Sequence, residues 1–269
     1  MINRGLIVGM MIFVAFVSLA CNVNIAGMDF SSVEVGALRT ESQAVEVAGT
    51  EQVTAEISFG VGELRVSGGA VNLAEADFAY NVDNWTPEVA YEVNDGQGKL
   101  RVNQPSFEKL TLPSEGMRNE WNIKLNEDVP LDLRLEMGAG TSQIDLSGLT
   151  LTNFVFKAGA GEAHLNLADT SVPELNLEAG VGEITVDLTG QWQNDLKAYI
   201  SSGIGTLTVK LPRDVGVRIE AQTGIGEISA IDFNRKDGAY VNNAFDTSDV
   251  TLNIELQGGV GEITIIQEG

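Results

Sequence analysis

A glutamate recurs at one position of a repeated motif, directly after a Gly-x-Gly tripeptide. Five copies of the motif carry it, at Glu63, Glu162, Glu183, Glu227 and Glu262. If the copies stack as neighbouring strands, Glu162 and Glu183 lie about 5 Å apart, which is the spacing of strands in a sheet. Two carboxylates at that distance repel each other unless a cation, a proton or backbone N–H groups intervene. These glutamates are therefore the first residues to consider for chemistry.

Three interpretations fit the glutamates. In the first, each carboxylate accepts hydrogen bonds from backbone N–H groups at its own turn or extends into solvent. In the second, they form a ladder that binds Ca²⁺ weakly, because that ion prefers hard oxygen ligands. Four residues would make this ladder: Glu162, Glu183, Glu227 and Glu262. In the third, two carboxylates act as acid and base on a polysaccharide.

The rest of the sequence favours the first interpretation. The chain lacks the dense Asp-Gly-Asp pattern of calcium loops, and it has no cluster of Lys and Arg that would hold an acidic sugar. His164 is the only histidine, which excludes multi-histidine metal sites and most histidine-dependent triads. It matches polar positions of the other repeats, so we expect it on the surface. We therefore expect no enzyme activity, no catalytic residue, no metal and no cofactor.

The motif belongs to a repeat that organises most of the chain. Copies begin at residues 138, 159, 180, 203, 224 and 259, with separations of 21, 21, 23, 21 and 35 residues. Residues 60–67 and 96–103 follow the same pattern at wider spacing. The longest separation contains a polar insertion, Asn234 to Ser248, which we interpret as a surface loop. A fixed period of this kind is typical of stacked repeat architectures.

Each repeat contains one strand before the Gly-x-Gly motif and one after it. Apolar residues alternate with polar ones on both sides, for example Leu131, Leu133 and Leu135 before it. Alternation indicates one buried and one solvated face per strand. The glycines then serve as tight corners, because they tolerate φ > 0 and close backbone approach. We assign this role to the following residues: Gly60, Gly62, Gly138, Gly140, Gly159, Gly161, Gly180, Gly182, Gly203, Gly205, Gly224, Gly226, Gly259 and Gly261. A phosphate-binding loop is the alternative, but it requires a following helix.

The predicted fold is all-β. It is a β-solenoid, a stack of two-strand repeats of about 21 residues, preceded by an irregular N-terminal β module. The module spans residues 53–128 and the regular repeats span residues 129–269. Consecutive repeats are expected to stack directly, because Glu136, Lys157 and Glu178 share one outward position and alternate in charge.

Six aromatic residues lie between residues 78 and 121. They are Phe78, Tyr80, Trp85, Tyr91, Phe107 and Trp121. They fit a hydrophobic core or a carbohydrate platform, and the alternation of Phe78 and Tyr80 with small and polar neighbours favours the core.

The N-terminus has the layout of a secretory signal peptide of the lipoprotein type. Arg4 precedes an apolar run, and residues 1–20 end in Ser18-Leu19-Ala20 before Cys21. Cys21 is the only cysteine, and acylation would account for it. Residues 21–52 are then the acylated cysteine and a flexible tether. A membrane-anchored, extracytoplasmic location in the cell envelope follows. The net charge of −22 argues against nucleic acid as a partner and leaves the lipid as the membrane contact.

Several segments together resemble the toast-rack family of bacterial envelope proteins, which is related to the C-terminal domain of cell-wall-active antibiotic response proteins. They include Glu41-Ser42-Gln43-Ala44-Val45, Gly60-Val61-Gly62-Glu63-Leu64, Glu75-Ala76-Asp77-Phe78-Ala79-Tyr80, Trp85-x-Pro87-Glu88-Val89 and Asn119-Glu120-Trp121-Asn122. The resemblance implies an all-β rack, an envelope location and a role in envelope stress. It implies no catalytic residues. The antibiotic-response relatives have N-terminal membrane helices where this chain has only a signal peptide.

The sequence thus favours a non-catalytic binding or scaffold module, with an envelope protein or a glycan as partner and cell-envelope stress sensing or response as its most specific version. The alternative is a β-helical glycan-active enzyme, a polysaccharide hydrolase or lyase, that uses acidic residues on the face of the solenoid.

Overall fold

The structure is a computed structural model that describes residues 35–105 and 116–268. The predicted signal peptide, Cys21 and Phe107 lie outside these residues. The described part consists of strands and one 3-10 helix, Asp83–Trp85. Its strands are β1 (Arg39–Val45), β2 (Gln52–Ser67), β3 (Ala74–Tyr80), β4 (Glu88–Asn94), β5 (Gln97–Asn103), β6 (Asn119–Leu125), β7 (Leu131–Asp145), β8 (Leu151–Asn166), β9 (Glu174–Asp187), β10 (Leu196–Pro212), β11 (Gly216–Ala230), β12 (Asn234–Lys236), β13 (Ala239–Val241) and β14 (Thr251–Glu268). The chain is all-β, as predicted.

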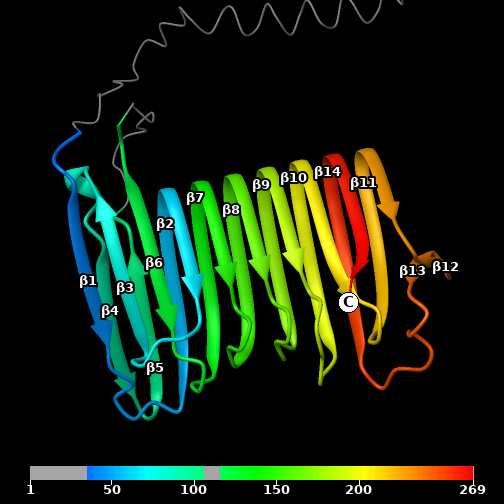
Figure 1. The fold of residues 1–269 in the computed structure, drawn as a ribbon, viewed down its shortest axis with the longest axis horizontal. Helices are drawn as coiled ribbons and strands as arrows, with labels where there is room; N and C mark the ends of the chain where they lie inside the picture. Colours follow the sequence, from blue (N-terminus) through cyan, green and yellow to red (C-terminus); the bar gives the residue numbers. More distant parts are fainter. Residues whose placement is uncertain (1–34, 106–115, 269) are drawn as a thin grey trace, which may run out of the picture. The chain divides into compact units, whose positions relative to one another are not determined.

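The strands form one open 14-stranded sheet (Figure 1). Seven long strands, β2, β7, β8, β9, β10, β14 and β11, lie side by side in parallel and each bends back at its Gly-x-Gly motif. We call the part of each strand before the motif its first arm and the part after it its second arm. The bends form one edge of the sheet, which we call the corner edge.

The arms form two layers that enclose the core. Alternate residues of both arms are buried, such as Val53, Ala55 and Ile57 in the first arm of β2 and Leu64 and Val66 in its second arm. Strict alternation therefore places one face of every arm against the opposite layer, as the sequence predicts. Burial of these aliphatic side chains is the main stabilising term of such a fold.

The N-terminal strands extend the two layers separately. β5 pairs in parallel with the first arm of β2, and the β4–β5 hairpin continues that layer. β6 pairs with the second arm of β2, and β3 and β1 follow it. Phe59 and Phe78 each pack edge-on against the Trp121 ring, with ring centroids 5.1 Å apart. Phe78, Tyr80 and Trp121 are buried, which confirms the core interpretation for these aromatics.

The order of the last repeats differs from the prediction. β7, β8, β9 and β10 follow one another, but β14 lies between β10 and β11. Consecutive stacking is therefore wrong for the last two repeats. The second arm of β14 buries Ile263 and Ile265, whereas Ile228 and Ala230 of β11 are half-exposed. The more apolar arm takes the inner position, and the more polar arm takes the place next to the sheet edge.

Three local assignments also need correction. Residues 96–103 are not a corner repeat, because Asp95 and Gly96 have φ of 49° and 76° and close the β4–β5 hairpin. β1, Arg39–Val45, lies within the range predicted as tether and pairs with β3. The insertion after β11 is not only a loop, since β12 and β13 form a hairpin that pairs with the first arm of β11.

Candidate functional site

The glycine corners form a continuous backbone ladder in which neighbouring strands approach closely. The second glycine of every corner has a φ between +124° and +144°. At Gly182, a Cβ atom would lie 1.7 Å from the carbonyl oxygen of Gly161. At Gly180, which has an ordinary φ, it would lie 2.3 Å from the carbonyl oxygen of Gly159. The first glycine is thus required for close approach and the second for both close approach and backbone conformation.

Two buried amide side chains end this ladder on the side of β6. The Gly60 N–H donates to Gln104 Oε1 at 2.8 Å, and Asn119 Nδ2 donates to the Val61 carbonyl oxygen at 2.8 Å. Asn119 Nδ2 also donates to Gln104 Oε1 at 2.9 Å. Gln104 and Asn119 therefore satisfy backbone groups of β2 that have no further Gly-x-Gly strand beside them.

The predicted glutamate ladder follows the corners along the second arms. Glu162 is paired with Glu183, and Glu262 is paired with Glu227. Thr206 lies between Glu183 and Glu262, so the four glutamates form two separate pairs. All four are exposed. The structure therefore brings the carboxylates together only in pairs, on an open surface.

Two of the ladder glutamates, Glu162 and Glu262, have a partner two residues further along the same strand. His164 Nε2 lies 2.8 Å from Glu162 Oε1, and the Thr264 hydroxyl donates to Glu262 at 3.2 Å. His164 is exposed, as predicted. Among residues 35–105 and 116–268, no group of three or more His, Cys, Asp and Glu side chains is placed to hold a metal ion.

A further pair, Glu63 and Glu120, lies on β2 and β6, and Thr141 separates it from Glu162. Arg118 Nε lies 2.5 Å from Glu120 Oε1, and Glu120 is paired with Glu63 in the sheet. The hydrogen bond from Arg118 lowers the pKa of the Glu120 carboxyl group and raises the pKa of the Arg118 guanidinium. Arg118 and Glu120 therefore form an ion pair at neutral pH.

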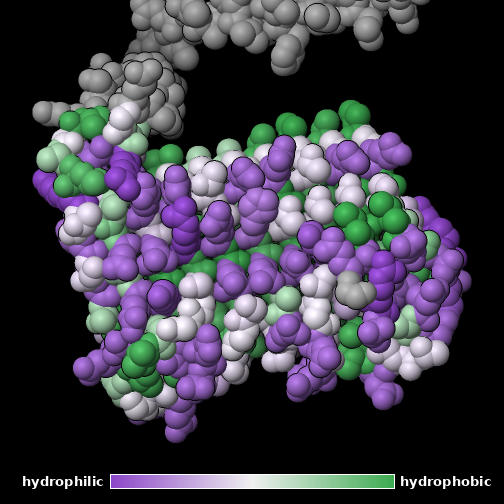
Figure 2. All heavy atoms as spheres, viewed as in Figure 1, coloured by the Kyte–Doolittle hydropathy of each residue, from purple (hydrophilic) through white to green (hydrophobic). Residues whose placement is uncertain are grey.

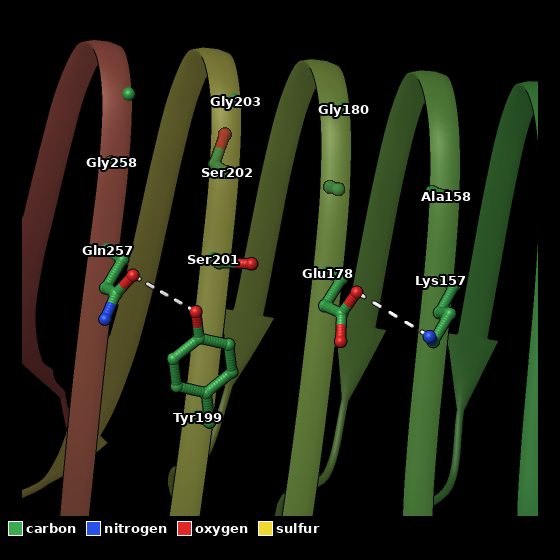
Figure 3. A pocket seen from close by; sticks show the side chains of 12 residues that line it. Lys157, Ala158, Glu178, Gly180, Tyr199, Ser201, Ser202, Gly203, Gln257 and Gly258 are labelled. Carbon is green, nitrogen blue, oxygen red and sulfur yellow. Dashed lines mark hydrogen bonds and ion pairs between the residues drawn. The ribbon is translucent and has the colours of Figure 1, made fainter.

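A shallow trough with mixed chemistry lies on the outer face of the first arms (Figure 3). It has a volume of about 590 Å³ and includes Lys157, Glu178, Tyr199, Ser201 and Gln257. The Tyr199 hydroxyl donates to Gln257 Oε1 at 3.1 Å, and Lys157 Nζ lies 3.6 Å from Glu178 Oε2. Since Glu136, Lys157 and Glu178 are neighbours in the sheet, the predicted alternation of charge is confirmed.

A second hollow of about 530 Å³ begins on the other side of Tyr199. Its polar residues include Asn176, Lys197, Arg218 and Asn253. Tyr199 lines both hollows, and its side chain is half-exposed. We call the two hollows together the Tyr199 trough. It combines an aromatic ring with amide, carboxylate and cationic groups on adjacent strands.

The sequence analysis missed this trough because it concentrated on glycines and glutamates. A signal was available, since Tyr199 lies four residues before its first glycine. The other long strands have no aromatic residue at that position. They have Glu56, Arg134, Val155, Asn176, Glu220 and Glu255 there. An aromatic side chain at an outward position of a repeat is a reason to suspect a binding surface.

The bent parallel strands, glycine corners and outward rungs define a class of all-β rack proteins. The family described as "N-terminal domain of toast_rack, DUF2154" matches residues 34–171 and 152–210. The chain belongs to this family.

The chain is also similar to solved structures. A crystal structure named "putative cell adhesion protein from Clostridium sporogenes" is 33% identical, with a TM-score of 0.67, and the match covers 86% of this chain and 100% of that one. A "putative adhesin" from Bacteroides fragilis is 12% identical, with a TM-score of 0.31, and the match covers 85% and 97% of the two chains. No curated protein sequence matches the chain.

Within residues 35–105 and 116–268, no helix has the length and apolar character needed to cross a bilayer.

Proposed function

We propose that the chain is a non-catalytic, membrane-anchored extracytoplasmic module, that the lipid anchor is at Cys21, and that the module binds a glycan of the cell envelope through the Tyr199 trough. The stacked repeats serve as a β-solenoid scaffold that holds the outward rungs of neighbouring strands in register. In envelope stress sensing or response, the signal would be the binding of that glycan to the Tyr199 trough.

The composition of the Tyr199 trough carries this proposal. A tyrosine ring offers an apolar face together with a hydroxyl group, while amides and carboxylates offer both donors and acceptors. Sugar rings present this combination of apolar C–H faces and hydroxyl groups. The trough is open and shallow, so it fits a chain of sugars lying across several strands.

The relative from Clostridium sporogenes supports a binding role. It is named a "putative cell adhesion protein", and its match covers 86% of this chain. Adhesion requires an exposed surface more than an enclosed catalytic cavity. The glutamate pairs on the second arms fit a catalytic role less well, because they lie on an open face away from the trough.

Binding to isolated envelope polysaccharide tests the glycan proposal. Tyr199→Ala should weaken binding by about two- to twelvefold, because aromatic contacts contribute about 0.5–1.5 kcal/mol. Thr208→Ala, on the second arm of the same strand, is the matched control and should bind like the parent. Equal binding by all three proteins would overturn the assignment of the trough. Release of shortened glycans by the parent would instead favour the alternative function, that of a glycan-active enzyme.

The anchor is tested separately by the mass of the N-terminal peptide and by fractionation. The mature chain should begin at Cys21 with acyl groups attached, and Cys21→Ser should move from the membrane to the soluble fraction. Lipoproteins carry more than one acyl chain, and a single chain gives only marginal attachment. Identical fractionation of variant and parent would exclude the anchor.

A further inference from the structure

Exposed aliphatic side chains gather on the corner edge. Among the described residues, nine large hydrophobic side chains are exposed, and six of them lie at or beside this edge. Four occupy the middle position of a Gly-x-Gly motif: Val181, Ile204, Ile225 and Val260, with exposed fractions of 52%, 53%, 70% and 45%. Exposed apolar groups that cluster in this way mark an interaction surface.

These four residues form one continuous row. Val181 is paired with Ile204, Ile204 with Val260, and Val260 with Ile225. Strands lie about 4.8 Å apart, so the row is about 14 Å long. Figure 2 shows apolar side chains along the upper edge, above β10, β14 and β11. We call Val181, Ile204, Val260 and Ile225 the corner ridge.

The chain enters the sheet at the same edge. Arg39, the first residue of β1, is paired with Tyr80, and Tyr80 is paired with Asn119. Asn119 lies against the corner glycine Gly62. The exposed Val35 and Leu38 precede β1. The Gly36 N–H donates to the Asn81 carbonyl oxygen beside Tyr80, so the first described residues, from Val35, lie at the edge that carries the corner ridge.

We propose that the corner ridge rests in the headgroup region of the bilayer that holds the lipid anchor. This inference rests on the proposed function, because the acyl groups at Cys21 bring the edge to the membrane. Cys21 and Val35 are 14 residues apart, a reach of about 45–50 Å when extended. That length allows the edge to touch the bilayer surface without requiring it.

A neutral phospholipid surface fits the corner ridge better than other occupants. The ridge follows the outer edge that the bends of the strands form (Figure 1), so it suits a deformable surface. Glu183, Glu227 and Glu262 are exposed one position beyond the corners, and the net charge is −22. These charges would repel both an anionic bilayer and the same edge of a second copy. The attraction to a neutral bilayer comes from burial of aliphatic surface.

A single fluorescent label can report the contact. Cys21 is the only cysteine and acylation consumes its thiol, so Ile204→Cys introduces one reactive thiol into the acylated chain. A polarity-sensitive dye at residue 204 should shift to the blue in phosphatidylcholine vesicles and resist quenching by aqueous iodide. Val71→Cys is the matched control, because Val71 is 87% exposed and follows β2 at the opposite edge. Its dye should stay in water.

Two results would overturn the proposal. One is equal quenching of the dyes at residues 204 and 71. The other is a blue shift at residue 204 that needs no vesicles and grows with protein concentration, which would indicate a second copy on the ridge.

A chain without the anchor separates this proposal from the proposed function. The mature chain with Cys21→Ser, residues 21–269, should bind excess phosphatidylcholine vesicles weakly, because it has neither the acyl groups nor the apolar run of the signal peptide. Adding Ile204→Glu and Ile225→Glu should weaken that binding at least about tenfold, since two aliphatic groups are lost and two charges are added. Unchanged binding contradicts the ridge, whereas an unacylated Cys21 in the parent contradicts only the anchor.

Discussion

Adding one methyl group to the glycine ladder should destabilise the sheet strongly at Gly182. A Cβ atom there would lie 1.7 Å from the carbonyl oxygen of Gly161, whereas real Cβ atoms stay beyond 3.0 Å. β8 and β9 must therefore separate locally by about 1.3 Å, the difference between these two distances. Backbone hydrogen bonds near 2.9 Å do not survive such an opening.

The expected loss has two parts. One or two ladder hydrogen bonds contribute about 1 kcal/mol each, and a non-glycine residue at φ of +142° costs about 1–3 kcal/mol. Gly182→Ala should therefore lower the free energy of unfolding by about 2–5 kcal/mol. For a chain of this size, that is a fall in Tm of about 4–20 °C.

Two variants separate these parts. Gly69→Ala changes a residue with φ of +90° and no atom within 4 Å of the added Cβ, so it should report the backbone conformation alone. Gly180→Ala has an ordinary φ but meets the Gly159 carbonyl oxygen at 2.3 Å, so it should report the close approach alone. In thermal melts, Gly182→Ala should have a lower Tm than either Gly69→Ala or Gly180→Ala. A Gly182→Ala melt within about 2 °C of the parent would refute the reasoning.

Three further predictions concern charge and strand order. Arg118 lowers the pKa of Glu120, so this ion pair stabilises the fold above the usual pKa of the carboxyl group, and the stabilisation is lost as the pH falls through the lowered pKa. Arg118→Gln should therefore have a lower free energy of unfolding than the parent at neutral pH and nearly the same one in acid. A difference between the two proteins that does not change with pH would contradict the ion pair. Lys157→Glu places three carboxylates on adjacent strands and should lower the Tm more at low salt than at high salt, because exposed charges are screened. Deleting β14 should abolish hydrogen-exchange protection in the second arm of β11, since β14 is its neighbour in the sheet; retained protection would mean that β11 can pair with β10.

Much of the sheet could be predicted because alternation and repetition are local properties of the sequence. The apolar residues at every second position gave the buried faces, and the repeat gave the register of Glu136, Lys157 and Glu178. The place of β14 could not be predicted in this way. Its Gly-x-Gly motif matches any neighbouring corner equally well, so the order depends on chain connection and on which arm tolerates the edge.

The candidate sites, too, could be predicted from the sequence only in part. Close approach at Gly180 and Gly182 follows from residue type, because only glycine lacks a Cβ. The Tyr199 trough depends on which outward side chains meet across β8, β9, β10, β14 and β11, and β14 is far from β8 and β9 in the sequence. The corner ridge required the exposed fractions of the middle residues, since valine and isoleucine are equally compatible with a buried corner.

Photo-crosslinking in living cells tests the central claim, that the anchored chain binds an envelope glycan through the Tyr199 trough. A photoreactive phenylalanine analogue replaces Tyr199 in one protein and Thr208 in another, so that the probes lie on the two arms of β10. The account predicts adducts sensitive to glycan-degrading enzymes from residue 199 and none from residue 208. Equal adducts from both positions, or none from residue 199, would contradict it.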